Sequence, residues 1–202
     1  MRWPGWSTLI TRSPDYESVL RGGAKRVPEM LLSASIHRDL NKSYGITYAA
    51  PADARQVQKP DRSIDLVSTT STLEHIPFDD LQSIMRELRR LCQPNAILIM
   101  LIDYSDHYSH GDRSISPYNF LRYSELQWSR FNPAIHYQNR MRHHQYGPLF
   151  TRCGFQILEE EGNRPDNWEL LLKRQTLDPE FGLMDASAVA ITSGFFVLRP
   201  VI

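Results

Sequence analysis

The chain has 202 residues, of which 41% are hydrophobic and 23% charged, and this composition suits one α/β domain with a hydrophobic core. Its 23 Lys and Arg balance its 23 Asp and Glu, which argues against a dedicated nucleic-acid-binding protein. No apolar run approaches the roughly 20 residues that span a bilayer, and no signal peptide is visible. We therefore expect a cytoplasmic protein without a membrane partner, whose two cysteines, Cys92 and Cys153, are reduced.

The first half of the chain begins irregularly and then alternates strands with a helix. Residues 1–45 show no clean period, and the first β-prone run is 46–50. A second strand is expected over 64–69, which is rich in β-branched residues. An amphipathic helix should follow over 78–92, because apolar residues recur there at helical spacing after Pro77.

The second half continues this alternation. Residues 96–102 are apolar on both faces, which predicts a central parallel strand covered by helices on each side. A polar and aromatic stretch, 103–135, comes next. The later expected elements are a helix over 137–152, a strand over 156–159, a helix over 166–174 and a strand over 191–198. The order predicts an α/β fold with a doubly wound sheet, whose ligands bind at the carboxyl ends of the strands.

Four short motifs carry a family resemblance. Asp65-Leu66-Val67 precedes Leu73-Glu74-His75-Ile76-Pro77, and Arg86-Glu87-Leu88-Arg89-Arg90-Leu91-Cys92-Gln93-Pro94-Asn95 leads into the apolar strand. Their order and distances resemble the second half of class I S-adenosylmethionine-dependent methyltransferases of type 11. The resemblance implies a Rossmann-like, mostly parallel sheet with an antiparallel last strand. It also implies S-adenosylmethionine as cofactor and a single domain over 1–202, with 103–135 as a substrate-covering insertion.

The resemblance also implies a set of cofactor-binding residues. Asp53 would accept a hydrogen bond from the adenine amino group, and Glu29 falls near the acidic position that holds the ribose hydroxyls. A helix-capping or turn role for Asp53 and a plain surface role for Glu29 stay open. The whole implied set is Glu29, Asp53, Ala54, Ser71, Thr72 and His75.

The chain departs from the family at the glycine-rich cofactor loop. No Gly-x-Gly occurs in the sequence, and Gly22-Gly23-Ala24 resembles the start of the family's second strand instead. Glycines in that loop let the backbone approach the cofactor. We therefore expect an N-terminally incomplete fold, unless residues 1–20 supply a replacement loop. As given, the chain should bind S-adenosylmethionine weakly or not at all.

Candidate catalytic residues directly follow the apolar strand. A hydroxyl acceptor needs a base for its proton, and His107 is placed for that role after the central strand. Asp103 or Asp106 would orient its ring, although a purely structural role for His107 stays open. The expected acceptor is a small molecule or a glycan, and a homodimer is a further option.

Two rival functions stay open. One is a non-catalytic, methyltransferase-like binding domain. The other is a metal-dependent hydrolase, although we expect no resident metal because such clusters in polar loops are more often solvated. Its ligands would come from Asp103, Asp106, His107, His110 and Asp112, which are types that bind metal ions.

Overall fold

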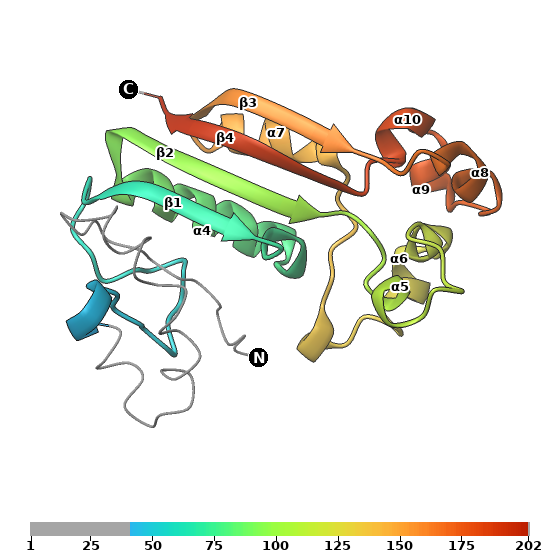
Figure 1. The fold of residues 1–202 in the computed structure, drawn as a ribbon, viewed down its shortest axis with the longest axis horizontal. Coiled ribbons are helices and arrows are strands. Elements are labelled where there is room, and N and C mark those ends of the chain that lie inside the picture. Colours follow the sequence, from blue (N-terminus) through green and yellow to red (C-terminus); the bar gives the residue numbers. More distant parts are fainter. Residues whose placement is uncertain (1–40, 202) are drawn as a thin grey trace.

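The computed structural model describes residues 41–201, so the expectations for Glu29 and for a replacement loop in 1–20 lie outside the described residues. One sheet is present in this part of the chain, with strand order β1-β2-β4-β3 (Figure 1). Its strands are β1 (Ile64–Thr70), β2 (Cys92–Asp103), β3 (Phe155–Asn163) and β4 (Ser193–Pro200).

The pairing of the strands confirms the two central expectations. β1 and β2 are adjacent and parallel, and β4 is antiparallel to β2. β3 also pairs antiparallel with β4, so between residues 41 and 201 the sheet is mixed and not mostly parallel. The expectation of a mostly parallel sheet is wrong for this region, because only one of its three strand pairs, β1 with β2, is parallel.

The strand expected over 46–50 was wrong. Ile46 is half-buried, residues 47–50 are exposed, and none of them pairs with a strand within the described part. Gly45 before them adopts a left-handed φ of 66°, and Pro51 after them has no backbone N–H to donate. A short run of residues with high β propensity does not form a strand when no partner strand lies beside it.

Two longer helices follow the sequence pattern. α4 (Phe78–Leu91) begins after Pro77, carries Asp79 and Asp80 in its first turn, and passes directly into β2. α7 (His143–Arg152) begins six residues later than expected and ends before Gly154, whose φ is 86°. The shorter helical elements are η1 (Leu73–His75), α5 (Tyr108–Gly111), η2 (Asn119–Arg122), α6 (Glu125–Trp128), η3 (Ala134–His136), α8 (Trp168–Lys173), α9 (Pro179–Gly182) and α10 (Ala186–Val189).

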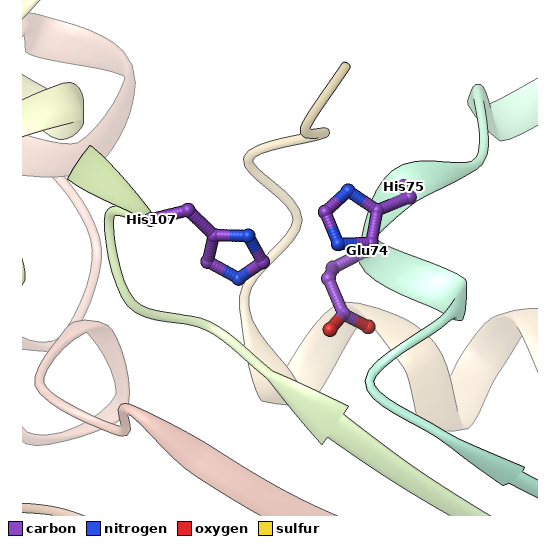
Figure 2. Close-up of side chains that lie close together, drawn as sticks. All are labelled: Glu74, His75 and His107. Carbon is purple, nitrogen blue, oxygen red and sulfur yellow. The ribbon is translucent and has the colours of Figure 1, made fainter. Parts of the chain in front are cut away.

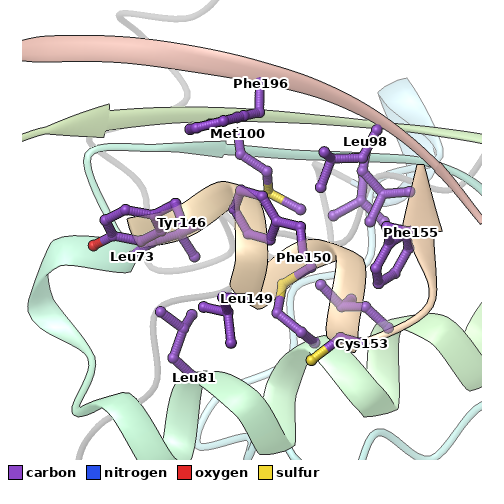
Figure 3. Close-up of a cluster of buried hydrophobic side chains, with 14 of the residues drawn as sticks. Leu73, Leu81, Leu98, Met100, Tyr146, Leu149, Phe150, Cys153, Phe155 and Phe196 are labelled. Atoms are coloured by element: carbon purple, nitrogen blue, oxygen red, sulfur yellow. The ribbon is translucent and has the colours of Figure 1, made fainter. Parts of the chain in front are cut away.

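The main core lies between one face of the sheet and the helices α4 and α7 (Figure 3). Leu98 and Met100 of β2 point into it and are fully buried. Ile99 and Leu101, on the other face of β2, are 41% and 42% exposed. Helices on both faces were expected, but in the part the structure describes they cover one.

The carboxyl ends of β1, β2 and β3 meet at one end of the sheet, where the smaller helices gather (Figure 1). There the 103–135 stretch has its own apolar core with α8, α9 and α10. Tyr118, Phe120 and Trp128 from this stretch are buried with Phe181 and Val189. The stretch is therefore a folded layer beside the strand ends. No helix among residues 41–201 is both long and apolar enough to cross a membrane.

The α4 face gives a stability prediction. Leu81 and Leu88 are 0% and 7% exposed, as the spacing predicted, and both belong to the main core. Leu81→Ala or Leu88→Ala should lower the free energy of unfolding by about 2–5 kcal/mol, because each leaves a cavity. Chemical denaturation measures this change. Arg86→Ala, on the exposed side of α4, is the control and should change stability by less than about 0.5 kcal/mol. An unchanged denaturation midpoint in both leucine variants would show that this face is misassigned.

Candidate functional site

The site is formed by the loops that follow β1 and β2. Because these strands are parallel neighbours, their carboxyl ends lie side by side. Ser71 turns the chain sharply with a φ of 45°, and its N–H donates to the Leu101 carbonyl at 3.0 Å. η1 starts two residues after Ser71. Its Glu74 and His75 face His107, which lies in the loop that follows β2 (Figure 2).

Four histidines and two carboxylates gather here, and we call them the histidine cluster. The rings of His75 and His107 have centroids 4.8 Å apart, and those of His107 and His110 are stacked at 4.9 Å. His136 lies 5.9 Å from His107 and 6.1 Å from His75. The two carboxylates are Glu74 and Asp103. The cluster concentrates titratable groups at the edge where ligands of this fold bind.

Glu74 is the least expected member of the cluster. Its side chain is 1% exposed, and neither carboxylate oxygen has a hydrogen-bond partner. Burial raises its pKa to about 8, so a proton is held there at neutral pH. Sequence reasoning used Glu74 only as part of a family motif. The sequence signal that could have pointed to Glu74 is its position between an apolar residue, Leu73, and a histidine, His75.

His107 and Asp103, two of the expected catalytic residues, are brought together. Nε2 of His107 lies 3.7 Å from Oδ2 of Asp103 and has no hydrogen-bond partner. Burial lowers the pKa of His107 to about 4, against the opposing effect of the Asp103 charge. The ring is therefore neutral at pH 7 and can accept a proton.

Asp106, the third expected catalytic residue, has a different environment. It is fully buried, and its carboxylate accepts hydrogen bonds from Tyr108 N at 2.9 Å and Asn119 Nδ2 at 3.0 Å. Its pKa is raised by burial. Asp106 thus ties α5 to η2 and shapes the loop that carries His107.

Three consecutive residues, Tyr137 to Asn139, connect both halves of the cluster, and we call them the brace. The Tyr137 carbonyl accepts a hydrogen bond from Nδ1 of His75 at 2.7 Å. Gln138 Oε1 accepts from the His107 backbone N–H at 3.2 Å, and its Nε2 donates to the carbonyl of Ser105 at 2.6 Å. Asn139 N donates to the Glu74 carbonyl at 2.7 Å.

The brace explains why α7 starts late. Asn139 Nδ2 donates to the carbonyls of Leu73 and Ile76, both at 2.9 Å, so its side chain is bound across the chain to η1. These bonds to η1 need residues 137–139 outside a helix, whereas sequence periodicity had extended the helix over them. The hydrogen bond to Tyr137 also fixes a tautomer. Because a carbonyl only accepts, Nδ1 of His75 carries the proton and Nε2 keeps a free lone pair.

The expected cofactor residues lie in two places. The Asp53 carboxylate is bound by Arg55, whose Nε and terminal nitrogen lie 3.0 and 2.8 Å from it, and Arg55 also reaches Asp80 at 2.5 Å. Ala54 lies half-buried in the same turn. Ser71 and Thr72 follow β1, with Thr72 Oγ1 donating to the Thr70 carbonyl at 3.0 Å. The structure brings His75 into the histidine cluster.

A cavity of about 420 Å³ adjoins the cluster at Asp103 and His110. Its lining also includes Ser109, Arg113 and Thr192. Hydroxyl groups and a guanidinium suit a polar ligand that carries oxygen atoms.

One known protein family matches part of the chain. The family described as methyltransferase domain matches residues 23–100, which include β1, η1, α4 and most of β2. Residues 23–100 are therefore similar to this methyltransferase domain family. None of the curated proteins matches the chain.

Several solved structures are similar in part. The [4+2]-cyclase SpnF is 17% identical, with a TM-score of 0.48, and the alignment covers 83% of this chain and 62% of that one. A Burkholderia thailandensis 1,6-didemethyltoxoflavin-N1-methyltransferase is 9% identical, with a TM-score of 0.48 and coverage of 85% and 59%. A Methanosarcina mazei methyltransferase is 13% identical, with a TM-score of 0.45 and coverage of 84% and 79%. The chain spans less than two thirds of the length of the first two.

Proposed function

We propose that this chain is an S-adenosylmethionine-dependent methyltransferase domain that holds its methyl acceptor at the histidine cluster. The observation that carries the proposal is the neutral, unpartnered His107 Nε2, next to Asp103 at the carboxyl end of β2. The neighbouring polar cavity suits a hydroxyl-bearing small molecule or glycan as acceptor. The family match supports the reaction class.

The cofactor would be held at the turn of Asp53 and at the end of β1. Asp53 would accept a hydrogen bond from the adenine amino group once Arg55 releases its carboxylate. The two side chains are 47% and 44% exposed, so this ion pair is screened by solvent and easily broken. Ser71 and Thr72 would line the cofactor beside β1. When bound, S-adenosylmethionine supplies an electrophilic methyl group.

The chain's own residues would receive the acceptor's proton. As the acceptor hydroxyl is methylated, its proton passes to Nε2 of His107, and the nearby Asp103 carboxylate stabilises the imidazolium that forms. Gln138 holds the loop of His107 while this happens, through the bonds to His107 N and Ser105 O. His75 belongs to the acceptor side in this proposal, because its ring is turned into the cluster.

Cofactor affinity is the first test of the proposal. We expect calorimetric titration of the 202-residue chain with S-adenosylmethionine to show binding weaker than micromolar, because no Gly-x-Gly loop is present to hold the cofactor's charged amino acid moiety. Asp53→Ala should weaken it further, and Asp61→Ala serves as an exposed control. Micromolar binding would contradict the expectation that the chain lacks a loop able to hold the cofactor's amino acid moiety. Binding that Asp53→Ala leaves unchanged would contradict the cofactor placement.

Methyl transfer is the second test. At saturating labelled S-adenosylmethionine, the protein should label fractions of polar small molecules or glycans. His107→Ala should slow this labelling by about 10²–10⁴-fold, the usual contribution of a positioned general base. His144→Ala removes an exposed histidine from α7 and should leave the rate unchanged. Equal rates in both variants would remove His107 from the mechanism. No labelling of any fraction would favour the non-catalytic binding domain.

A further inference from the structure

Glu74, His75 and His107 have the composition of a metal site. Each offers one ligand atom, and these atoms all lie within 4.8 Å of one another. Two imidazoles and one carboxylate are the ligands of many catalytic zinc sites and of non-haem iron sites, where they leave coordination positions open. We propose that these three residues bind a divalent first-row transition-metal ion. This goes beyond the proposed function and does not rest on it.

Unsatisfied groups aimed into one space support the proposal. Both oxygens of Glu74 are buried without a hydrogen-bond partner, and so is Nε2 of His107. An isolated buried carboxyl group is costly unless something compensates its lost hydration. Figure 2 shows the rings of His75 and His107 facing each other from η1 and the β2 loop, with the Glu74 carboxylate beside them. A cation there would give the Glu74 carboxylate the partner that it lacks.

His75 is prepared for a metal by its outer hydrogen bond. Nδ1 is bound to the Tyr137 carbonyl at 2.7 Å, which leaves the lone pair of Nε2 for a cation. Metal-binding histidines commonly have this arrangement, in which the second nitrogen donates to a carbonyl or carboxylate that fixes the ring. Asn139 holds the backbone on both sides of Glu74, at Leu73 and Ile76. The brace therefore orients two of the three ligands.

A second set, Asp103, His107 and His110, also lies within 4.8 Å but fits less well. Asp103 Oδ1 already accepts hydrogen bonds from Ser105 N at 2.8 Å and Ser105 Oγ at 2.6 Å. His110 Nε2 lies 3.0 Å from Ser105 Oγ, and its side chain is 55% exposed. Asp103 and His110 of the second set thus have hydrogen-bond partners, whereas the carboxylate oxygens of Glu74 have none. The ion would occupy the lone pair of His107 Nε2, so the ion-bound state and the proton-accepting state of His107 exclude each other.

Titration with ZnCl₂ after chelator treatment tests the proposal. We expect one equivalent to bind the full chain in calorimetry. Glu74→Gln and His75→Ala should each weaken binding by at least the roughly 10–100-fold that loss of an outer-shell partner costs. His144→Ala should leave the affinity unchanged, and His110→Ala, which removes only a ring stacked on His107, should weaken it less than either ligand variant does. Far-ultraviolet circular dichroism checks that each variant is folded.

A measurement on the unmodified chain keeps the test independent of folding in the variants. On addition of Zn²⁺, the imidazole nitrogen resonances of the ligands His75 and His107 should shift strongly, whereas those of His110, which only stacks on His107, should shift much less. Weaker binding in His110→Ala together with unchanged binding in His75→Ala would place the ion in the second set and overturn the proposal. So would the absence of Zn²⁺ binding. Neither result touches the test of methyl transfer, which has its own readout.

Discussion

The hydrogen bonds of the brace are the constraint on which the candidate site depends. Parallel pairing brings the ends of β1 and β2 together, but it does not fix the loops beyond them. Tyr137 and Asn139 bind the β1 loop, and Gln138 binds the β2 loop. One short segment therefore sets the distance between His75 and His107. A rigid support of this kind is what catalytic and metal-binding side chains need.

The candidate site contains buried polar atoms that have no hydrogen-bond partner. Glu74 is buried and His107 is half-buried, and each has buried polar atoms that lack hydrogen-bond partners, which opposes folding. Local conflicts of this kind are expected at functional sites, because binding supplies the missing partner. The neighbouring Arg142 shows the contrast. It is fully buried and its Nε also lacks a partner, but its two terminal nitrogens donate hydrogen bonds to the carbonyls of Tyr104, Val189 and Ile191, which gives it a structural role.

Local periodicity was sufficient to predict the β1-α4-β2 unit, because its strands and helix bury one continuous apolar face. It was not sufficient for residues 46–50, whose β propensity has no partner strand among the described residues, nor for 137–142. The latter look helical by composition, but Gln138 and Asn139 bind loops far away in the sequence. That His107 and Asp103 lie close together could be predicted from their place at the end of a central strand. The role of Glu74 could not, because its burial depends on the packing of η1 beneath the brace.

The tautomer of His75 tests most directly whether the brace organises this site. In the full chain, long-range ¹H–¹⁵N correlation of the imidazole groups at mildly alkaline pH, with His75→Gln for assignment, reports which ring nitrogen carries the proton. The bond to the Tyr137 carbonyl predicts that His75 is protonated at Nδ1 and unprotonated at Nε2. Protonation at Nε2 instead would contradict the account, because the brace would then not hold His75 and its ring could not offer Nε2 to the cluster.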